Sequence, residues 1–377
     1  IETRPDEVNK QEIYKLLSYG VTRVQIGVQT THDHILKKIN RQCYTKDTIM
    51  AIKLLKEAGL KVLIHIMPNL PFSSPELDKE MFNTLLYNDD FKVDEWKIYP
   101  TSVTTTSDKD KESVNTVIEK WFVDGKYIPY SNDDLYDLLI YVKERVQPYI
   151  RISRIFRDIP IDNIIGGASI PNMREHLQSQ MTVPCQCIRC REVRDRNIDK
   201  KNIRFRIRRF KSSGATEYFL AFESNDPNGP YKKNSAPILH GFLRLRIPSK
   251  DKIMYKDHTI PFLDNKAKVR ELHVYGEMIP TYMKELESYK NKNKIISKNQ
   301  HMGLGSSLLW YAEWIAYFHG TNGIVINSGV GVRNYYKKKG YKKEGSYMVK
   351  PFINIYSMYV IILWIYILYI LWIFLIL

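Results

Sequence analysis

The sequence predicts a two-part protein, α/β in the first part and α+β in the second. Residues 1–160 alternate apolar, strand-length runs with helical segments, which is typical of a parallel sheet or barrel. After residue 201 the pattern changes to successive strands joined by turn-rich links. A chain of 377 residues has room for two such domains and needs no disulfides to bury their cores.

Each element of the first part has a local signal. Asp6 is placed to cap a helix that ends at Gly20, and Thr45 or Asp47 opens a helix that ends near Gly59. Further helices are expected after Pro75 and over residues 133–145. Strands are expected over residues 21–29, 61–67, 95–99 and 151–158. In a parallel barrel, the carboxyl ends of such strands are the functional edge.

The second part is expected to contain strands over residues 203–209, 217–223, 239–247, 269–275, 323–326 and 341–349. Helices are expected over 303–318 and 332–339. A lysine- and asparagine-rich stretch, 284–298, is expected to be a solvated loop. Strands followed by mixed helices and strands indicate a separate α+β domain.

The chain is strongly basic, with a formal net charge of +16. This charge favours a polyanionic partner, either nucleic acid or an anionic membrane. In a strand, Arg204, Arg206 and Arg208 share one face, and Arg244 and Arg246 repeat this arrangement. Such faces suit a phosphate backbone, although a merely solvated face is the alternative.

Residues 351–377 contain no charged residue. As a helix they would extend about 40 Å, against roughly 30 Å of bilayer hydrocarbon. Tyr and Trp recur in the segment and lysines precede it, as at the cytosolic flank of a membrane span. We expect a transmembrane tail anchor on the cytosolic face of the mitochondrial outer membrane or endoplasmic reticulum. A buried core helix is the alternative.

Three of the four cysteines are clustered as Cys185-x-Cys187-x2-Cys190. Thiolates at this spacing suit a zinc site that lacks one ligand. The candidates for the fourth ligand are Cys43, the nearby His176 and a more distant histidine. Free thiols in a loop are the alternative.

The segment Gln300-His-Met-Gly303-Leu-Gly305-Ser306 precedes an expected helix. It resembles the pyrophosphate-binding turn of the GNAT acetyltransferases. Amides at a helix N-terminus bind phosphate, and glycine permits close approach. Downstream lie Tyr335 and Tyr336, the candidate catalytic residues, since a phenol can protonate a leaving thiolate. A structural helix cap with core tyrosines is the alternative.

Several motifs occur in one order along residues 1–350. They include Glu2-Thr-Arg-Pro-Asp6, His65-Ile-Met-Pro68, Lys97-Ile-Tyr-Pro-Thr101, the cysteine cluster and the glycine turn. In this order they closely resemble the Elongator catalytic-subunit family, the tRNA wobble-uridine acetyltransferases. The resemblance implies a partial radical S-adenosylmethionine (SAM) barrel over 1–180, a cysteine-containing linker with zinc over 181–201 and a GNAT domain over 202–350. The anchor, 351–377, lies outside the common family pattern.

The resemblance also implies a reaction. Acetyl-CoA and a SAM-derived radical form carboxymethyluridine at the wobble uridine of tRNA, within an Elongator-type complex. The implied acetyl-CoA contacts are Glu271, Leu272, His273, Val274, Gln300, Gly303, Leu304, Gly305, Ser306 and Tyr335. Weaker candidates for the SAM or uridine side are Glu2, Arg4, Gln25, Gln29, His65 and Lys97.

The family holds its [4Fe–4S] cluster with cysteines spaced C-x4-C-x2-C, and the four cysteines here lack that spacing. We expect the cluster ligands upstream of Ile1. The resemblance implies tRNA and other Elongator-type subunits as partners. We leave open whether the chain also forms a homodimer. Two other functions remain open: a protein lysine acetyltransferase, and a non-catalytic membrane-tethered scaffold.

Overall fold

The computed structural model describes residues 1–105, 116–157, 159–168, 173–194, 200–225, 236–248, 263–275 and 303–352. Its first part is built on a parallel sheet in the order β1-β2-β3-β4-β6. These strands are β1 (Glu2–Thr3), β2 (Arg23–Gln29), β3 (Lys61–Ile66), β4 (Glu95–Ile98) and β6 (Arg151–Arg154). A separate ribbon pairs β5 (Ser102–Thr104) with β7 (Ile164–Gly167).

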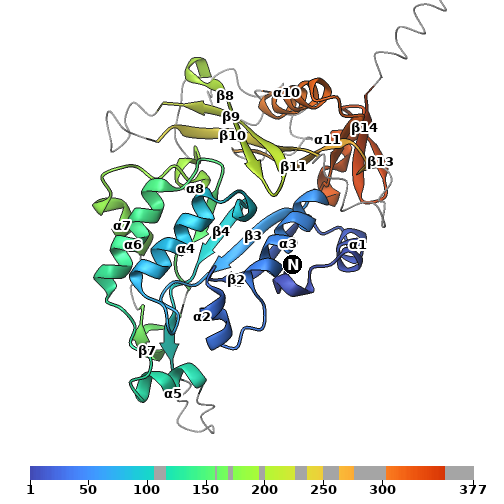
Figure 1. The fold of residues 1–377 in the computed structure, drawn as a ribbon. Coiled ribbons are helices and arrows are strands. Elements are labelled where there is room, and N and C mark those ends of the chain that lie inside the picture. Colours follow the sequence, from blue (N-terminus) through green and yellow to red (C-terminus); the bar gives the residue numbers. More distant parts are fainter. Residues whose placement is uncertain are drawn as a thin grey trace, which may run out of the picture.

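Most helices of the first part lie around this sheet, and one packs on the β5–β7 ribbon (Figure 1). They are α1 (Lys10–Ser18), α2 (Asp33–Lys38), α3 (Thr45–Glu57), α4 (Pro75–Tyr87), α5 (Val117–Val123), α6 (Asn132–Arg145), α7 (Met173–Gln180) and α8 (Ile188–Arg191). The β–α alternation predicted for this part is confirmed, since β2, β3 and β4 are parallel neighbours. Short elements such as α2 and the β5–β7 ribbon carried too little periodicity to be predicted.

The predicted helix from Asp6 to Gly20 is corrected at its start. Residues Pro5–Glu7 form a 3-10 turn, and α1 begins only after Asn9, whose Oδ1 accepts a hydrogen bond from the amide of Glu12 at 2.9 Å. Asp6 instead pairs with Arg4, so its carboxylate is not the cap. The predicted end is confirmed by Gly20, which has a φ of 74°.

The second part is built on a seven-stranded sheet in the order β13-β14-β12-β11-β10-β9-β8. Its strands are β8 (Arg204–Ser212), β9 (Ala215–Ser224), β10 (Ile238–Ile247), β11 (Lys266–Val274), β12 (Gly323–Ile326), β13 (Lys342–Glu344) and β14 (Tyr347–Pro351). Its helices include α10 (Leu304–Phe318) and α11 (Arg333–Lys337). Only the β11–β12 pair is parallel. The strand predicted over 341–349 is a hairpin, because Gly345 turns the chain with a φ of 56°.

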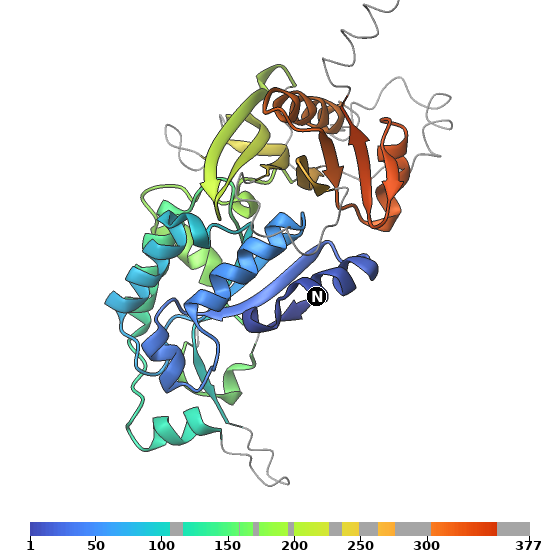
Figure 2. The same ribbon diagram turned by 45° about the vertical axis from the view of Figure 1, so that its right-hand side comes forward.

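The seven-stranded sheet is covered on both faces. One core joins residues of the first part to Phe219, Phe242 and Tyr347 of the second sheet. The other core lies between that sheet and α10, and includes Leu308 and Ala312. The sheet is therefore sandwiched, with α10 on the side away from the first part (Figure 2).

Among the helices that the structure describes, none combines the length and the hydropathy that a membrane span requires. Of the predicted anchor, 351–377, only Pro351 and Phe352 are described, and Pro351 still belongs to β14. The rest of that segment and the predicted loop 284–298 lie outside the described residues.

Candidate functional site

The glycine turn leads directly into α10, as predicted. Gly303 stands at the N-cap with a φ of 76°, a backbone conformation that residues with a Cβ rarely adopt. A Cβ at Gly305 would lie 3.3 Å from the Tyr335 hydroxyl and 3.5 Å from Cγ2 of Val274. Glycine therefore keeps the start of α10 open where β11 and α11 approach it. Gln300 lies outside the described residues.

Strands β11 and β12 separate beside this turn. They pair only from Lys266↔Gly323 to Val269↔Ile326, whereas β11 continues to Val274. On its other side β11 stays paired with β10 as far as Gly241↔Val274. The β12-facing edge of Glu271–Val274 thus has no ladder partner among the described strands. An extended ligand can hydrogen-bond to such an edge next to the N-terminus of α10.

The two candidate tyrosines differ in their surroundings. Tyr335 points its hydroxyl toward Gly305, and among the described residues this buried atom has no hydrogen-bond partner of good geometry. Burial raises the pKa of Tyr335, and the neighbouring Ser306 hydroxyl partly opposes this. Tyr336 instead is buried in the core under α10, and its ring packs edge-on against Tyr335 and Tyr341. The position of Tyr336 suits packing, and that of Tyr335 suits proton donation.

The remaining predicted acetyl-CoA residues are not equivalent. Leu304 is buried, and Leu272 packs against the core between α10 and the second sheet. His273 is exposed, with its ring 4.4 Å from that of Tyr275. The Glu271 carboxylate is turned away into ion pairs with Lys61 at 2.8 Å and Arg244 at 2.9 Å. Glu271 can therefore offer a ligand only its backbone.

A buried ionic network joins the two parts, and the sequence did not predict it. Arg270 of β11 contacts Asp94 at 2.5 Å and Glu217 at 2.5 Å. Arg246 contacts Glu217 at 2.9 Å and also pairs with Glu57 of α3. Burial alone would raise the pKa of Glu217, but Arg270, Lys56 and Arg246 lower it to about 2.

The network corrects one prediction about basic faces. Arg244 and Arg246 are buried and paired with carboxylates, so they form no phosphate-binding face. On β8, Arg208 pairs with Glu223 at 2.7 Å, while Arg204 and Arg206 are exposed. The last two line a hollow of about 330 Å³. Phosphate binding by these two arginines stays a prediction.

On the parallel sheet, four of the six predicted polar residues meet. Gln25 Oε1 accepts a hydrogen bond from Lys97 Nζ at 2.6 Å and lies 3.1 Å from Nε2 of His65. His65 Nδ1 lies 3.3 Å from the carboxylate of Glu2. Burial lowers the pKa of His65, although Glu2 opposes this. These side chains form a polar face that could hold a polar ligand, and we call them the sheet cluster.

The other two predicted residues lie apart from the sheet cluster. Arg4 forms its ion pair with Asp6 at 2.5 Å. Gln29 has a φ of 70°, and its Oε1 is buried with no partner among the described residues. Next to it, Arg41 donates a hydrogen bond to the carbonyl of Gly27 at 2.9 Å.

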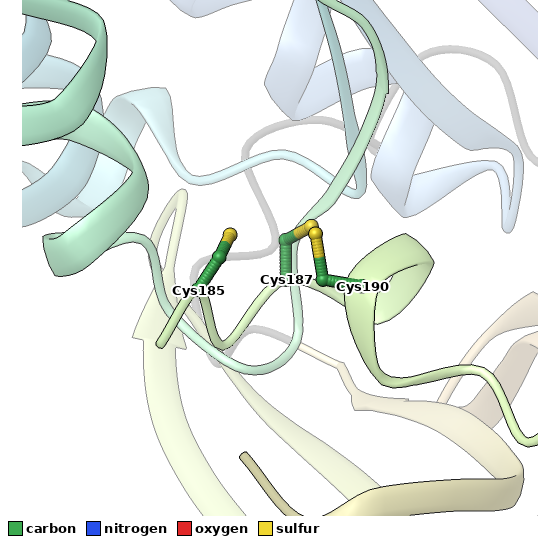
Figure 3. Close-up of side chains that lie close together, drawn as sticks. All are labelled: Cys185, Cys187 and Cys190. Carbon is green, nitrogen blue, oxygen red and sulfur yellow. The ribbon is translucent and has the colours of Figure 1, made fainter. Parts of the chain in front are cut away.

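The three clustered cysteines converge, as Figure 3 shows. Their sulfur atoms lie within 4.8 Å of one another, and no other His, Cys, Asp or Glu among the described residues joins them. Cys185 and Cys187 are buried, and Cys190 lies on α8. The neighbouring Cys185 and Cys187 thiols, together with Lys143 and Arg174, lower the pKa of Cys190. A thiolate at this position suits a metal.

The suggested fourth ligands lie elsewhere. Cys43 is buried beside Asp6, and the ring of His176 packs on Tyr136 at 4.7 Å. Around Cys190 stand cationic and amide groups, with Lys143 Nζ at 4.0 Å, Arg174 Nη1 at 3.8 Å and Gln178 Nε2 at 3.6 Å. Neither Cys43 nor His176 completes the site in this structure.

Comparison with known proteins places this geometry in a family. The radical SAM superfamily profile matches residues 1–83, and the radical SAM C-terminal domain profile matches residues 93–182. The structure of Elp3 from Methanocaldococcus infernus with an N-terminal deletion superposes with a TM-score of 0.78. It is 37% identical, and the match covers 93% of this chain and 77% of that one.

Curated relatives agree with the structural match. The tRNA uridine(34) acetyltransferase of Methanocaldococcus jannaschii is 38% identical over 93% of this chain and 60% of its own length. That of Dehalococcoides mccartyi is 37% identical over 93% of this chain and 71% of its own. Elongator complex protein 3 of Homo sapiens is 34% identical over 93% of this chain and 59% of its own.

The first part of the chain is therefore a radical SAM domain. The whole chain belongs to the family of the tRNA uridine(34) acetyltransferases and Elongator complex protein 3. It spans about 60% of the length of the first curated relatives that it matches.

Proposed function

We propose that the chain is the catalytic subunit of an Elongator-type complex, which uses acetyl-CoA and a SAM-derived radical to form carboxymethyluridine at the wobble uridine of tRNA. One observation supports the use of acetyl-CoA: the separation of β11 from β12 beside the glycine turn. The modification of tRNA is supported by the family membership, the radical SAM match and the relatives' names. The proposal assigns the second sheet to a GNAT acetyltransferase domain.

Three features at and beside the glycine turn would act on acetyl-CoA. Amides at the start of α10 would bind the pyrophosphate, since they lack helical partners. The open backbone edge of β11, 271–274, would bind the amide groups of the pantetheine arm. The Tyr335 hydroxyl, beside Gly305, would give its proton to the leaving thiolate.

The radical SAM match implies SAM and a [4Fe–4S] cluster. Bound together, they supply the radical that activates the acetyl group. The sheet cluster of Glu2, Gln25, His65 and Lys97 offers polar groups for SAM or uridine. The three clustered cysteines lie at the other end of the sheet, because Ile188 of α8 donates to the carbonyl of Ile150, just before β6. They therefore fit a zinc site in the linker better than a cluster at the working edge.

We also propose tRNA, other Elongator-type subunits and a membrane as partners. The charge of +16 and the exposed Arg204 and Arg206 favour an RNA backbone. The charge-free segment 353–377 favours a tail anchor on the cytosolic face of a membrane.

Substitution at the glycine turn tests the proposed function. Gly305→Val should abolish acetyl-CoA binding, measured by calorimetry on the full chain, because even a Cβ meets Tyr335 at 3.3 Å. Gly331→Val is the matched control, since nothing lies within 4 Å of the Cβ position of Gly331. Equal affinity of both variants for acetyl-CoA would contradict the proposed binding site at the glycine turn.

Labelled acetyl-CoA then separates the candidate reactions. The full-length protein should transfer label to tRNA and depend on SAM. Transfer to a histone peptide without tRNA would favour a protein lysine acetyltransferase. Binding of partners with no transfer at all would favour a scaffold.

A further inference from the structure

The outer face of α10 carries only aromatic side chains. Among residues Leu304–Phe318, the exposed ones are Trp310, Trp314 and Phe318, at 53%, 43% and 76%. We call these three residues the aromatic stripe. A surface helix of a soluble domain ordinarily presents charged and polar residues to water. The stripe therefore indicates that something other than water covers this face.

No charge interrupts the stripe. Glu313 is the one charged residue of α10, and its carboxylate accepts a hydrogen bond from Tyr341 at 2.8 Å and pairs with Lys350 at 2.7 Å. The stripe residues are spaced by four, so their rings meet along the helix. The centroids are 5.7 Å apart for Trp310 and Trp314, and 5.5 Å apart for Trp314 and Phe318. The result is one continuous apolar surface.

Ring contacts connect this surface to the last described residue of the chain. Tyr317 lies 6.2 Å from Trp314 and 5.9 Å from Phe318, and it also lies 6.0 Å from Phe352. The Phe352 amide donates to the carbonyl of Asn322 at 3.0 Å, which fixes where the chain leaves the domain. The charge-free segment 353–377 begins at the next residue. In both views, α10 and the end of β14 lie side by side (Figures 1 and 2).

We propose that the aromatic stripe lies in the interfacial layer of the bilayer that the C-terminal segment enters. This inference rests on the proposed tail anchor. Trp is enriched in that layer, and Trp and Phe are common on the apolar face of helices that lie in it. From Trp310 to Phe318 the helix rises about 12 Å, so α10 would lie along the membrane surface. The contact would orient the second domain, with the glycine turn at one end of the membrane-facing helix.

A bilayer fits this position better than another protein does. One ring, that of Tyr317, connects the stripe to Phe352, so any protein covering the stripe would have to share the space where the charge-free segment enters the membrane. A lipid surface needs no additional partner. A second copy of the chain or another subunit is an alternative occupant that the experiment below detects.

Depth-dependent quenching of tryptophan emission tests the inference. The full chain would be reconstituted into phosphatidylcholine–phosphatidylserine vesicles that carry nitroxide lipids at shallow or deep acyl positions. A Trp364→Phe, Trp372→Phe variant removes the fluorophores of the charge-free segment. We expect the shallow label to quench this variant roughly twofold more strongly than the deep label. Adding Trp310→Phe and Trp314→Phe should abolish that quenching, because the two remaining tryptophans are the buried Trp96 and Trp121, which lies on α5 of the first part.

Flotation of the same samples reports insertion separately. Protein that floats with the vesicles but keeps unquenched Trp310 and Trp314 emission would overturn the stripe assignment and leave the anchor intact. Protein that does not float would overturn both. Unquenched emission together with crosslinks through α10 would assign the stripe to a second copy or another subunit, which also overturns the inference.

Discussion

Single residues decide which tyrosine can act at the glycine turn. Tyr335 and Tyr336 are adjacent in the sequence, yet only Tyr335 points its hydroxyl at Gly305. Successive residues of a helix point in directions about 100° apart, so neighbours occupy different environments. Because burial raises its pKa, Tyr335 stays protonated near neutral pH and can donate a proton.

Tyr335→Phe should slow acetyl transfer to tRNA about 100-fold, because it removes the proton donor and little volume. Acetyl-CoA affinity should change little, so the effect should appear in kcat rather than KM. Single-turnover rates with labelled acetyl-CoA provide the measurement.

Tyr311→Phe is the matched control, since Tyr311 stacks on Phe205 at 4.0 Å, outside the turn. A large loss of rate in Tyr336→Phe with none in Tyr335→Phe would reverse the assignment of the two tyrosines.

At the scale of elements, short segments position the candidate ligands. The separation of β11 and β12 opens one strand edge, and the single helical turn of α8 brings Cys187 and Cys190 together with Cys185. Both arrangements depend on how one element ends. Where a strand or helix ends is a local feature of the backbone. The two strands β11 and β12 are nevertheless distant from each other in the sequence.

Cys187→Ala should remove about one equivalent of zinc per chain and lower the thermal midpoint, because structural zinc sites contribute to folding stability. Elemental analysis of the purified full chain, together with calorimetric melting, measures both effects.

Cys43→Ala is the matched control, as Cys43 is also buried but lies outside the cysteine cluster. It should retain the metal. Wild-type protein that holds iron and sulfide at these cysteines instead would contradict the zinc assignment.

At the scale of the whole molecule, the two parts share a charged interface. The network of Asp94, Glu217, Arg246 and Arg270 is buried where the second sheet packs on the first part. Removing one partner from such a network leaves an uncompensated charge, so its geometry constrains how the two parts dock. The sheet cluster and the glycine turn are thereby held in a fixed relation.

The stability of the folded protein should fall in acid. Burial opposes ionisation of Glu271, but Lys61 and Arg244 lower its pKa from 4.5 to about 2, and Glu217 is shifted likewise. The folded state therefore binds fewer protons than the unfolded state between these values. Stability from these groups is full above pH 4.5 and is lost as the pH falls toward 2. Glu271 contributes on the order of 3 kcal/mol, and Glu217 acts in the same direction, so urea unfolding across that range measures the effect.

Glu271→Gln should flatten this response, because the substituted side chain does not titrate. The exposed Glu344 offers the control, since Glu344→Gln should leave the slope unchanged. An unchanged slope in Glu271→Gln would show that the interface does not dominate acid unfolding.

Much of the fold was predictable because it depends on local patterns. The strand over 323–326 and the helix that ends at Phe318 match the structure, since apolar periodicity and glycine punctuation define them. The glycine turn and the cysteine spacing were likewise visible in the sequence. The basic strand of Arg244 and Arg246 was misassigned, because alternation shows which residues share a face but not what that face meets.

The amino-acid sequence was enough to predict the order of the longer helices and strands, the family and the residue types at the two candidate sites, because these follow from neighbours along the chain. Three features emerged from the three-dimensional structure alone: Arg244 is an interface residue, Tyr335 rather than Tyr336 faces the turn, and α10 presents aromatic rings outward. Each of these depends on burial and on charges contributed by segments distant in sequence. Burial and long-range pairing arise when sheets pack, and no local pattern encodes them.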